Sequence, residues 1–256
     1  MLLAIDVGNT NISFGVFDNN KYIITYRINT HPVRTADEYY ALLTVLFNSK
    51  DIRISDINGV ILCSVVPVTH EALIRLARKH FRCEPLILSA DLDLGINIDY
   101  NPKTGVGADR LANAVAAHAL YKTNCIVVDF GTATSFDVID SRGNYLGGAI
   151  VPGIQISLDA LFQRASKLTE IELVSPKTAI GKDTEGALLS GVIYGYAGQI
   201  DAIVENITLE LDSKPKVIAT GGQSYIISEH SHCIEETIDN LTLDGLNIIY
   251  NRVKND

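Results

Sequence analysis

Six residues near the start of the chain combine the side chains that phosphate chemistry needs. They are Asp6-Val7-Gly8-Asn9-Thr10-Asn11, and they end an apolar run that predicts a buried strand. A carboxylate at a strand end can hold a hydrated Mg²⁺, and a glycine lets backbone N–H groups approach an anion closely. The amide and hydroxyl side chains can donate to phosphate oxygens. An ordinary tight hairpin uses the same residue types, so this stretch alone leaves both interpretations open.

A second stretch, in the middle of the chain, repeats this pattern. It is Asp129-Phe130-Gly131-Thr132-Ala133-Thr134, which begins 123 residues after Asp6. Beyond the turn, the matching residues Ser13 and Ser135 are 122 residues apart, so the second turn is one residue shorter. A repeat at half the chain length predicts two similar lobes, each opening with a strand–turn–strand hairpin. A nucleoside triphosphate between the two hairpin tips is the ligand that suits them.

The elements around these turns predict an α/β fold. Residues 1–122 read as three consecutive strands followed by alternating helices and strands, and residues 123–256 open with the same three strands. This order predicts a mixed sheet with crossover helices in each lobe. Apolar spacing and helix-start signals predict the main helices over residues 38–47, 68–81, 111–121, 154–166, 183–211 and 242–253.

A long polar loop over residues 89–110 interrupts the alternation of elements. Long loops inside compact domains are usually functional, and this one ends in Gly107-Ala108-Asp109-Arg110 at the start of an alanine-rich helix. Asp109 can be a catalytic carboxylate beside an arginine. An aspartate in a first helical turn is also favoured by the helix dipole alone, so the tetrapeptide does not decide between the two interpretations.

Composition limits the kinds of partner that the chain can bind. With a formal net charge of −9 it lacks the general basic surface of a nucleic-acid-binding protein. The four cysteines are scattered, which favours free thiols in a reducing compartment. The chain opens with an apolar strand rather than a basic and then apolar leader, and no apolar run approaches the roughly 20 residues of a membrane span. We therefore expect a cytoplasmic protein that contacts no membrane.

Two glycine-rich places in the second half suggest close approaches. Small residues at 191, 195, 197 and 198 lie within the predicted long helix and permit either self-association or close packing inside the chain. Gly221-Gly222 follows a strand over residues 216–219, which suits a phosphate or adenosine contact. The cluster of His230, His232 and Cys233 has no second ligand pair, so we interpret it as a solvated loop rather than a metal site.

Four of these motifs together resemble the type III pantothenate kinases, within the actin-like superfamily of sugar kinases, chaperone ATPases and actin. The resemblance covers nearly the whole chain, and its motifs are Asp6-Val7-Gly8-Asn9-Thr10-Asn11, Gly107-Ala108-Asp109-Arg110, Asp129-Phe130-Gly131-Thr132-Ala133-Thr134 and Gly147-Gly148-Ala149-Ile150-Val151-Pro152-Gly153. It implies two duplicated actin-like (ribonuclease H-like) lobes, over residues 1–122 and 123–256, with mixed sheets flanked by helices. It also implies ATP-dependent phosphorylation of pantothenate to 4′-phosphopantothenate, the first step of coenzyme A biosynthesis.

The resemblance further implies a cytoplasmic homodimer that needs Mg²⁺ and a monovalent cation, K⁺ or NH₄⁺. In such an enzyme the ATP phosphates would be held by the first tip, Asp6-Val7-Gly8-Asn9-Thr10-Asn11-Ile12-Ser13, with Asp6 holding Mg²⁺ through the phosphates. Thr132 would contact ATP, with Gly221 and Gly222 as further contacts expected from the glycine pair, and Asp129 would hold the monovalent cation. Asp109 would be the general base. Pantothenate would contact Tyr100, Gly107, Ala108, Asp109 and Arg110, together with Thr184 across the dimer interface.

Two other functions remain open. One is a different small-molecule kinase of the same superfamily, such as a sugar kinase, which usually has a longer chain with extra subdomains. The other is an accessory factor linked to transcriptional activation that keeps the fold without the activity. The intact Asp6, Asp109 and Asp129 and the negative net charge count against the second of these.

Overall fold

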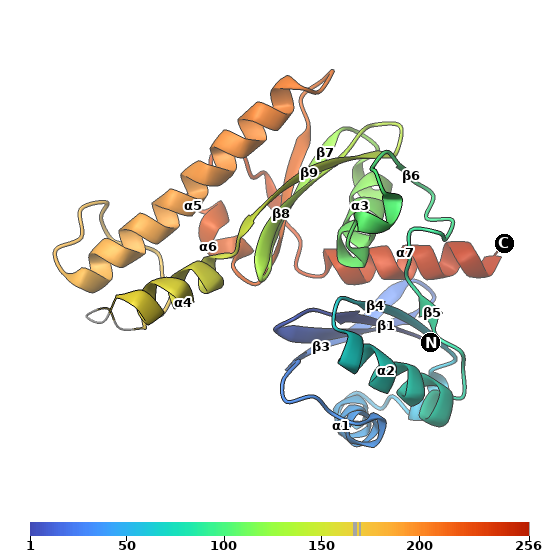
Figure 1. Cartoon of the computed structure of the whole chain (residues 1–256). Helices are drawn as coiled ribbons and strands as arrows, with labels where there is room; N and C mark the ends of the chain where they lie inside the picture. The colour runs from blue at the N-terminus through green and yellow to red at the C-terminus, as the bar shows by residue number, and fades with distance from the viewer. Residues whose placement is uncertain (166–167, 169, 256) are drawn as a thin grey trace. The chain divides into compact units, whose positions relative to one another are not determined.

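The structure is a computed structural model that describes residues 1–165, 168 and 170–255. The chain folds into two compact units, each built on one mixed sheet with helices against it (Figure 1). Unit 1 comprises Met1–Ala116 together with the C-terminal helix from Leu241, and unit 2 comprises Ala117–Asn240.

The sheet of unit 1 has the strand order β3-β2-β1-β4-β5. β1 runs antiparallel to β2 and parallel to β4, so the hairpin predicted at the N-terminus forms the centre of this sheet. The strands are β1 (Leu2–Val7), β2 (Asn11–Asp18), β3 (Lys21–Asn29), β4 (Gly59–Ser64) and β5 (Leu86–Ile87). The two-residue strand β6 (Asn97–Ile98) lies in the long polar loop.

Helices cover both faces of this sheet because its strands bury apolar side chains on both sides. Leu3 and Ile5 face the core that Leu43 and Leu73 complete, while Gly15 on the opposite face meets Leu243. The helices of unit 1 are α1 (Ala36–Asn48), α2 (Pro67–Leu76), the first part of α3 (Ala108–Tyr121) and α7 (Leu241–Asn255). α2 continues as a π-helical turn that ends at Phe81.

Five strands of the second sheet, all from unit 2, repeat the strand order of the first sheet, as β9-β8-β7-β10-β11. β7 is antiparallel to β8 and parallel to β10, which matches the relation of β1 to β2 and β4. The strands are β7 (Cys125–Phe130), β8 (Ala133–Ile139), β9 (Asn144–Pro152), β10 (Lys216–Gly221) and β11 (Glu236–Thr237). The helices are α4 (Ile154–Arg164), α5 (Thr184–Leu209) and α6 (Ser224–Ser228). The predicted internal repeat and the mixed α/β fold are therefore confirmed.

The C-terminal helix belongs to unit 1, whereas the sequence assigned residues 123–256 to the second lobe. α7 packs on the first sheet so closely that a side chain at Gly59 would overlap the Tyr250 hydroxyl. It also meets α3, where the Thr242 hydroxyl donates to the Asn113 side chain at 2.8 Å. Apolar periodicity predicts the helix but does not reveal which sheet the helix joins, because that contact is separated by more than 180 residues in sequence.

The long helix α5 contributes one face to the core of unit 2. Its buried side chains include Ile193, Ala197 and Ile200. Among the described residues it is the one helix with the length and apolar composition to cross a membrane, with a mean hydropathy of 1.3 over its best window. The sequence analysis did not expect such a segment. The buried face is what a core helix of a globular unit needs.

Candidate active site

The first hairpin tip is closed by backbone hydrogen bonds and held from behind by Thr30. The Gly8 N–H donates to the Asn11 carbonyl at 2.9 Å, which leaves the two residues between them exposed. The fully buried Thr30 donates its hydroxyl to the Gly8 carbonyl at 2.7 Å and its N–H to the Thr10 carbonyl at 2.9 Å. With these carbonyls bound on one side, the tip presents its polar side chains and remaining N–H groups outward, the arrangement that an anion requires.

Asp6 and Asp109, the two carboxylates predicted for catalysis in unit 1, both act on a third residue, Cys63. Cys63 is the strand neighbour of Asp6 in the parallel β1–β4 pair and is fully buried. Burial first, then the Asp6 and Asp109 carboxylates, raise the pKa of the Cys63 thiol well above its ordinary value. The thiol therefore stays protonated and donates a hydrogen bond to Asp6. Asp6 and Asp109 therefore both lie within electrostatic reach of Cys63, although 103 residues separate them in sequence.

Asp109 lies in the first turn of α3, as predicted, and its carboxylate folds back over the start of the helix. The Arg110 N–H donates to Asp109 Oδ1 at 2.8 Å. The same oxygen occupies the space beside Gly107, where a Cβ would lie only 2.5 Å from it. A side chain at position 107 would therefore displace the free end of the Asp109 side chain, and the glycine leaves the carboxylate its place.

Tyr100 belongs to the loop that precedes this helix. It is 38% exposed, and its ring edge lies beside Gly105, at 3.5 Å from where a Cβ of that residue would be. Gly105 ends a single 3₁₀ turn, Lys103–Gly105, that leads to Gly107. Tyr100, Gly107, Ala108, Asp109 and Arg110 thus lie along one short segment of unit 1.

The second hairpin tip has the same construction with one residue fewer. The Gly131 N–H donates to the Ala133 carbonyl at 3.1 Å, and Asp129 is the strand neighbour of Ser135, as Asp6 is of Ser13. Gly153 donates its N–H to the Thr132 carbonyl at 3.1 Å and approaches the turn so closely that a Cβ would lie 2.4 Å from the same oxygen. The glycine that follows β9, Gly153, is therefore explained by the close approach of the backbone to the second hairpin tip.

Oxygen atoms surround Asp129. A Cβ at Gly221, whose φ is +92°, would lie 2.7 Å from Asp129 Oδ1 and 2.6 Å from the Phe130 carbonyl, so this glycine keeps the space beside both oxygens clear. Ser135 and Thr220 flank Asp129 on the neighbouring strands. A carboxylate with carbonyl and hydroxyl oxygens is the donor set that hard cations take, so the residues present fit a bound K⁺.

The other predicted residues of unit 2 lie on separate elements. Gly222 donates its N–H to the Phe130 carbonyl at 3.2 Å, which ties the glycine pair to the strand that carries Asp129. Thr184 is the first residue of α5, directly after Asp183, whose carboxylate caps the helix by accepting the Gly186 N–H at 2.7 Å. Among the described residues there is no group of three or more His, Cys, Asp or Glu side chains that could hold a metal ion by themselves.

Sequence reasoning missed Thr30 and Cys63. Thr30 sits in a loop with no pattern of its own, and Cys63 reads as one more apolar residue of a buried strand. Only the strand pairing reveals their roles, because β4 is parallel to β1 in a register that sets Cys63 beside Asp6.

Comparison with known proteins identifies the family of the chain. The family model for type III pantothenate kinase matches residues 2–206. A type III pantothenate kinase from Desulfatibacillum aliphaticivorans is 47% identical over 256 residues, which is the full length of both chains.

Solved structures show the same fold at low identity. A protein from Campylobacter jejuni described as a Baf family transcriptional activator has a TM-score of 0.62 at 20% identity and covers 99% of this chain and 100% of its own. An inorganic polyphosphate/ATP-glucomannokinase from an Arthrobacter strain has a TM-score of 0.51 at 14% identity, over 98% of both chains. These likenesses concern the fold alone, and they confirm the predicted α/β fold with two mixed sheets flanked by helices. On the family model and the full-length relative, the chain belongs to the type III pantothenate kinase family.

Proposed function

We propose that this chain transfers the terminal phosphoryl group of ATP to the primary hydroxyl of pantothenate, with Asp109 as the general base. The product is 4′-phosphopantothenate, and the reaction is the first step of coenzyme A biosynthesis. The observation that carries the proposal is that the phosphate-binding tip and the Asp109 turn belong to one unit, where Asp6 is the strand neighbour of Cys63 and Asp109 acts electrostatically on the same thiol. Family membership supplies the substrate.

The first tip binds the phosphates of ATP in this proposal. Residues Asp6 to Ser13 offer N–H groups around Gly8 and the side chains of Asn9, Thr10 and Asn11, which are exposed or half-buried. Asp6 holds Mg²⁺ through the phosphates; the metal, when bound, neutralises charge that develops on the transferred group. The protonated Cys63 thiol donates a hydrogen bond to the Asp6 carboxylate from the neighbouring strand.

Asp109 orients the acceptor hydroxyl and takes its proton. Its Oδ1 is bound by the Arg110 N–H, which leaves Oδ2 to face the substrate. The carboxylate lies in the first turn of α3, where the helix dipole favours a negatively charged group. Phosphoryl transfer depends mainly on positioning and charge neutralisation, so Asp109 needs no unusual basicity.

Pantothenate carries a carboxylate, which a chain of net charge −9 repels unless local donors receive it. Arg110, Tyr100 and the N–H groups at Gly107 and Ala108 are the donors that we assign to the substrate. Thr184 completes the set from the other subunit of a homodimer.

Asp129 holds a monovalent cation, K⁺ or NH₄⁺, and the second tip contacts ATP through Thr132. Gly221 and Gly222 add backbone contacts. The clear space beside Asp129 Oδ1 and the Phe130 carbonyl supports the cation. Activity measured with Tris as the only added monovalent cation tests it, because full activity there would exclude a cation requirement.

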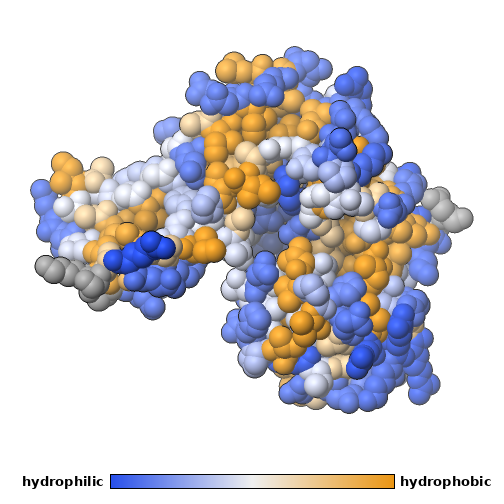
Figure 2. Space-filling view, viewed as in Figure 1, coloured by the Kyte–Doolittle hydropathy of each residue, from blue (hydrophilic) through white to orange (hydrophobic). Residues whose placement is uncertain are grey.

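The homodimer is supported by the outer face of α5. Gly191, Gly195, Gly198 and Ala202 recur at helical spacing on the face opposite the buried one, and all four are exposed. A Cβ on any of the three glycines would meet no atom of the described residues. Figure 2 shows further exposed apolar surface on the molecule. Ile150 of β9 is exposed on the sheet face opposite the one that α5 covers, so it adds nothing to the α5 face. Small residues let two helices approach closely, so we assign this face to a second copy of the chain. We assign the enzyme to the cytoplasm.

Replacing Asp109 by Asn tests the proposal. We expect kcat to fall by a factor on the order of 10² or more, the scale of losing a general base, while the fold persists because Asn is nearly isosteric. Phosphorus NMR should identify the wild-type product as a monoester of the primary hydroxyl. Asp99→Asn, on the same loop and exposed, is the matched control. A D109N enzyme with near-normal kcat would remove Asp109 from the role of base.

A further inference from the structure

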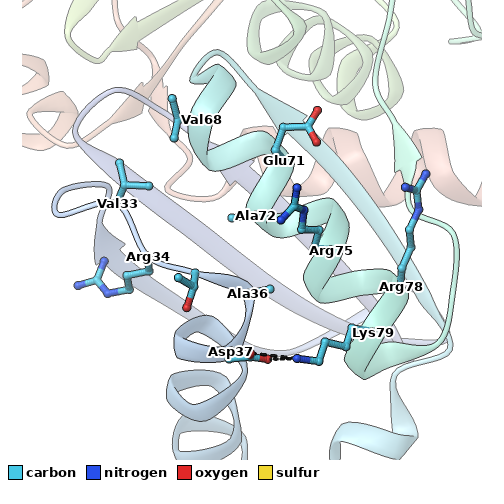
Figure 3. A pocket seen from close by; sticks show the side chains of 11 residues that line it. Val33, Arg34, Ala36, Asp37, Val68, Glu71, Ala72, Arg75, Arg78 and Lys79 are labelled. Atoms are coloured by element: carbon cyan, nitrogen blue, oxygen red, sulfur yellow. Dashed lines mark hydrogen bonds and ion pairs between the residues drawn. The ribbon is translucent and has the colours of Figure 1, made fainter.

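We propose that unit 1 has a second anion-binding site, in a pocket between α2 and the segment that leads into α1 (Figure 3). The pocket has a volume of about 740 Å³, within the range of small-molecule sites. Its ligand is a small organic anion, a phosphate monoester or a carboxylate with one short apolar part. The described residues that line it include none of the first hairpin tip and none of the Asp109 turn, so it is distinct from the proposed catalytic site.

Charge is the first argument for an anion. The pocket is lined by four cationic side chains and two carboxylates, in a chain that is acidic overall. Two of the cations are already neutralised, since Lys79 pairs with Asp37 at 2.7 Å and Arg78 pairs with Glu84 at 2.6 Å. Arg34 and Arg75 remain against the single lining carboxylate of Glu71, so the lining keeps a net positive charge.

These two arginines keep their positive charge available. The Arg34 guanidinium donates to the Asn29 carbonyl at 2.9 Å, a neutral acceptor. Arg75 is exposed, and its side chain makes no hydrogen bond or ion pair with any residue that the structure describes. Figure 3 shows the Arg75 side chain over the space between α2 and the entry to α1. A guanidinium whose N–H donors are available binds phosphate or carboxylate through bidentate hydrogen bonds.

The apolar end of the pocket is the second argument. Val33 and Val68 line it and are 43% and 65% exposed, and Ala36 and Ala72 add small apolar surface. A ligand that covers the two valines removes this surface from water, which inorganic phosphate alone would not do.

Two buried hydroxyls lie next to the lining residues. Tyr39 Oη faces Thr69 and Arg34, but among the described residues neither Tyr39 Oη nor Thr69 Oγ1 makes a hydrogen bond of ordinary geometry. Burial raises the pKa of Tyr39, and the nearby Arg34 guanidinium opposes that rise. Buried polar groups without partners are costly, and a bound anion that shifted Arg34 would change the surroundings of both.

Both walls of the pocket continue into segments that hold the first hairpin tip. The wall that carries Val33 begins at Thr30, which binds the Gly8 and Thr10 carbonyls. The wall formed by α2 follows Val65, whose N–H donates to the Val7 carbonyl at 3.1 Å. Occupation of the pocket is therefore expected to alter the binding of ATP phosphates at the tip.

Calorimetric titration of the full chain tests the site, with phenyl phosphate and benzoate as the two probes. Mg²⁺, a non-hydrolysable ATP analogue and pantothenate saturate the catalytic site first, so that the probes report on other sites. We expect one further equivalent of probe to bind the wild type. Arg75→Gln should weaken binding about tenfold or more, the effect of losing a charge-assisted contact, and Arg75→Lys should retain part of it.

Arg164→Gln is the matched control, because it removes the same charge from an exposed helical arginine of unit 2. Binding of phenyl phosphate alone, or of benzoate alone, identifies the anion class and supports the site. Absence of binding by both probes at millimolar concentration overturns the proposal, as does equal affinity in wild type and R75Q, or equal weakening by R164Q. The KM of the wild type for ATP is then measured with and without a bound probe. An unchanged KM would contradict the coupling between the pocket and the first hairpin tip.

Discussion

Gly107 and Asp109 form the contact on which the proposed chemistry depends most closely. One oxygen of the carboxylate occupies the space that a side chain at position 107 would need. The neighbouring Gly105 has no such conflict, since a Cβ there would only touch the Tyr100 ring at ordinary distance. The two glycines therefore have different roles although they stand two residues apart.

Gly107→Ala should lower kcat while leaving the fold intact. The clash is with the free end of the Asp109 side chain, so the carboxylate turns away and the backbone stays in place. A displacement of about 1 Å costs on the order of 10² in rate. Steady-state kinetics and a thermal melt measure both effects, with Gly105→Ala as the control. Equal kcat in the two variants would show that Gly107 does not keep Asp109 in position.

Among the elements, α7 is the one whose position is least visible in the sequence, and it carries a carboxyl that reports on its packing. Asp244 lies against the first sheet, where burial raises its pKa to about 6, although a hydrogen bond from Tyr22 acts in the opposite direction. A carboxyl whose pKa is higher in the folded state stabilises the fold at low pH, and this contribution is lost as the pH rises through the folded pKa.

Asp244→Asn should therefore change how stability depends on pH. Between about pH 4 and pH 7 the free energy of unfolding of the variant should rise relative to that of the wild type, because Asn avoids burying a charge. Urea titrations at several pH values measure this difference. Carboxylates such as Asp140 and Asp201, whose pKa values are lowered, contribute equally to the pH dependence of both proteins. Their contributions therefore cancel in the difference between variant and wild type. A constant difference across this range would contradict the raised pKa.

The outer face of α5 gives the second prediction at this scale. Gly195→Leu fills space that is empty within the unit, so the unit should fold, but a close helix pair would be overpacked. We expect the dimer dissociation constant to rise at least about tenfold. Analytical ultracentrifugation measures it, and Ala41→Leu on the exposed side of α1 is the control. If G195L dimerises as the wild type does, the subunits meet elsewhere.

For the whole molecule, the repeated hairpins were predictable and the long-range contacts were not. Asp6 and Asp129 stand in local patterns, and the strand registers confirm the one-residue difference between their turns. Asp109 follows from a local helix start. Cys63, Thr30 and the place of α7 depend on which strands and helices become neighbours, and residue spacing along one chain carries no information about that.

The central claim is that the chain is selective for pantothenate as phosphoryl acceptor. A coupled assay of ADP release, run with pantothenate, glucose and mannose at equal concentration, tests it most directly. We predict ADP release with pantothenate alone, at a rate that falls sharply in D109N. Release with either sugar at a comparable rate, or at the same rate without any acceptor, would contradict it.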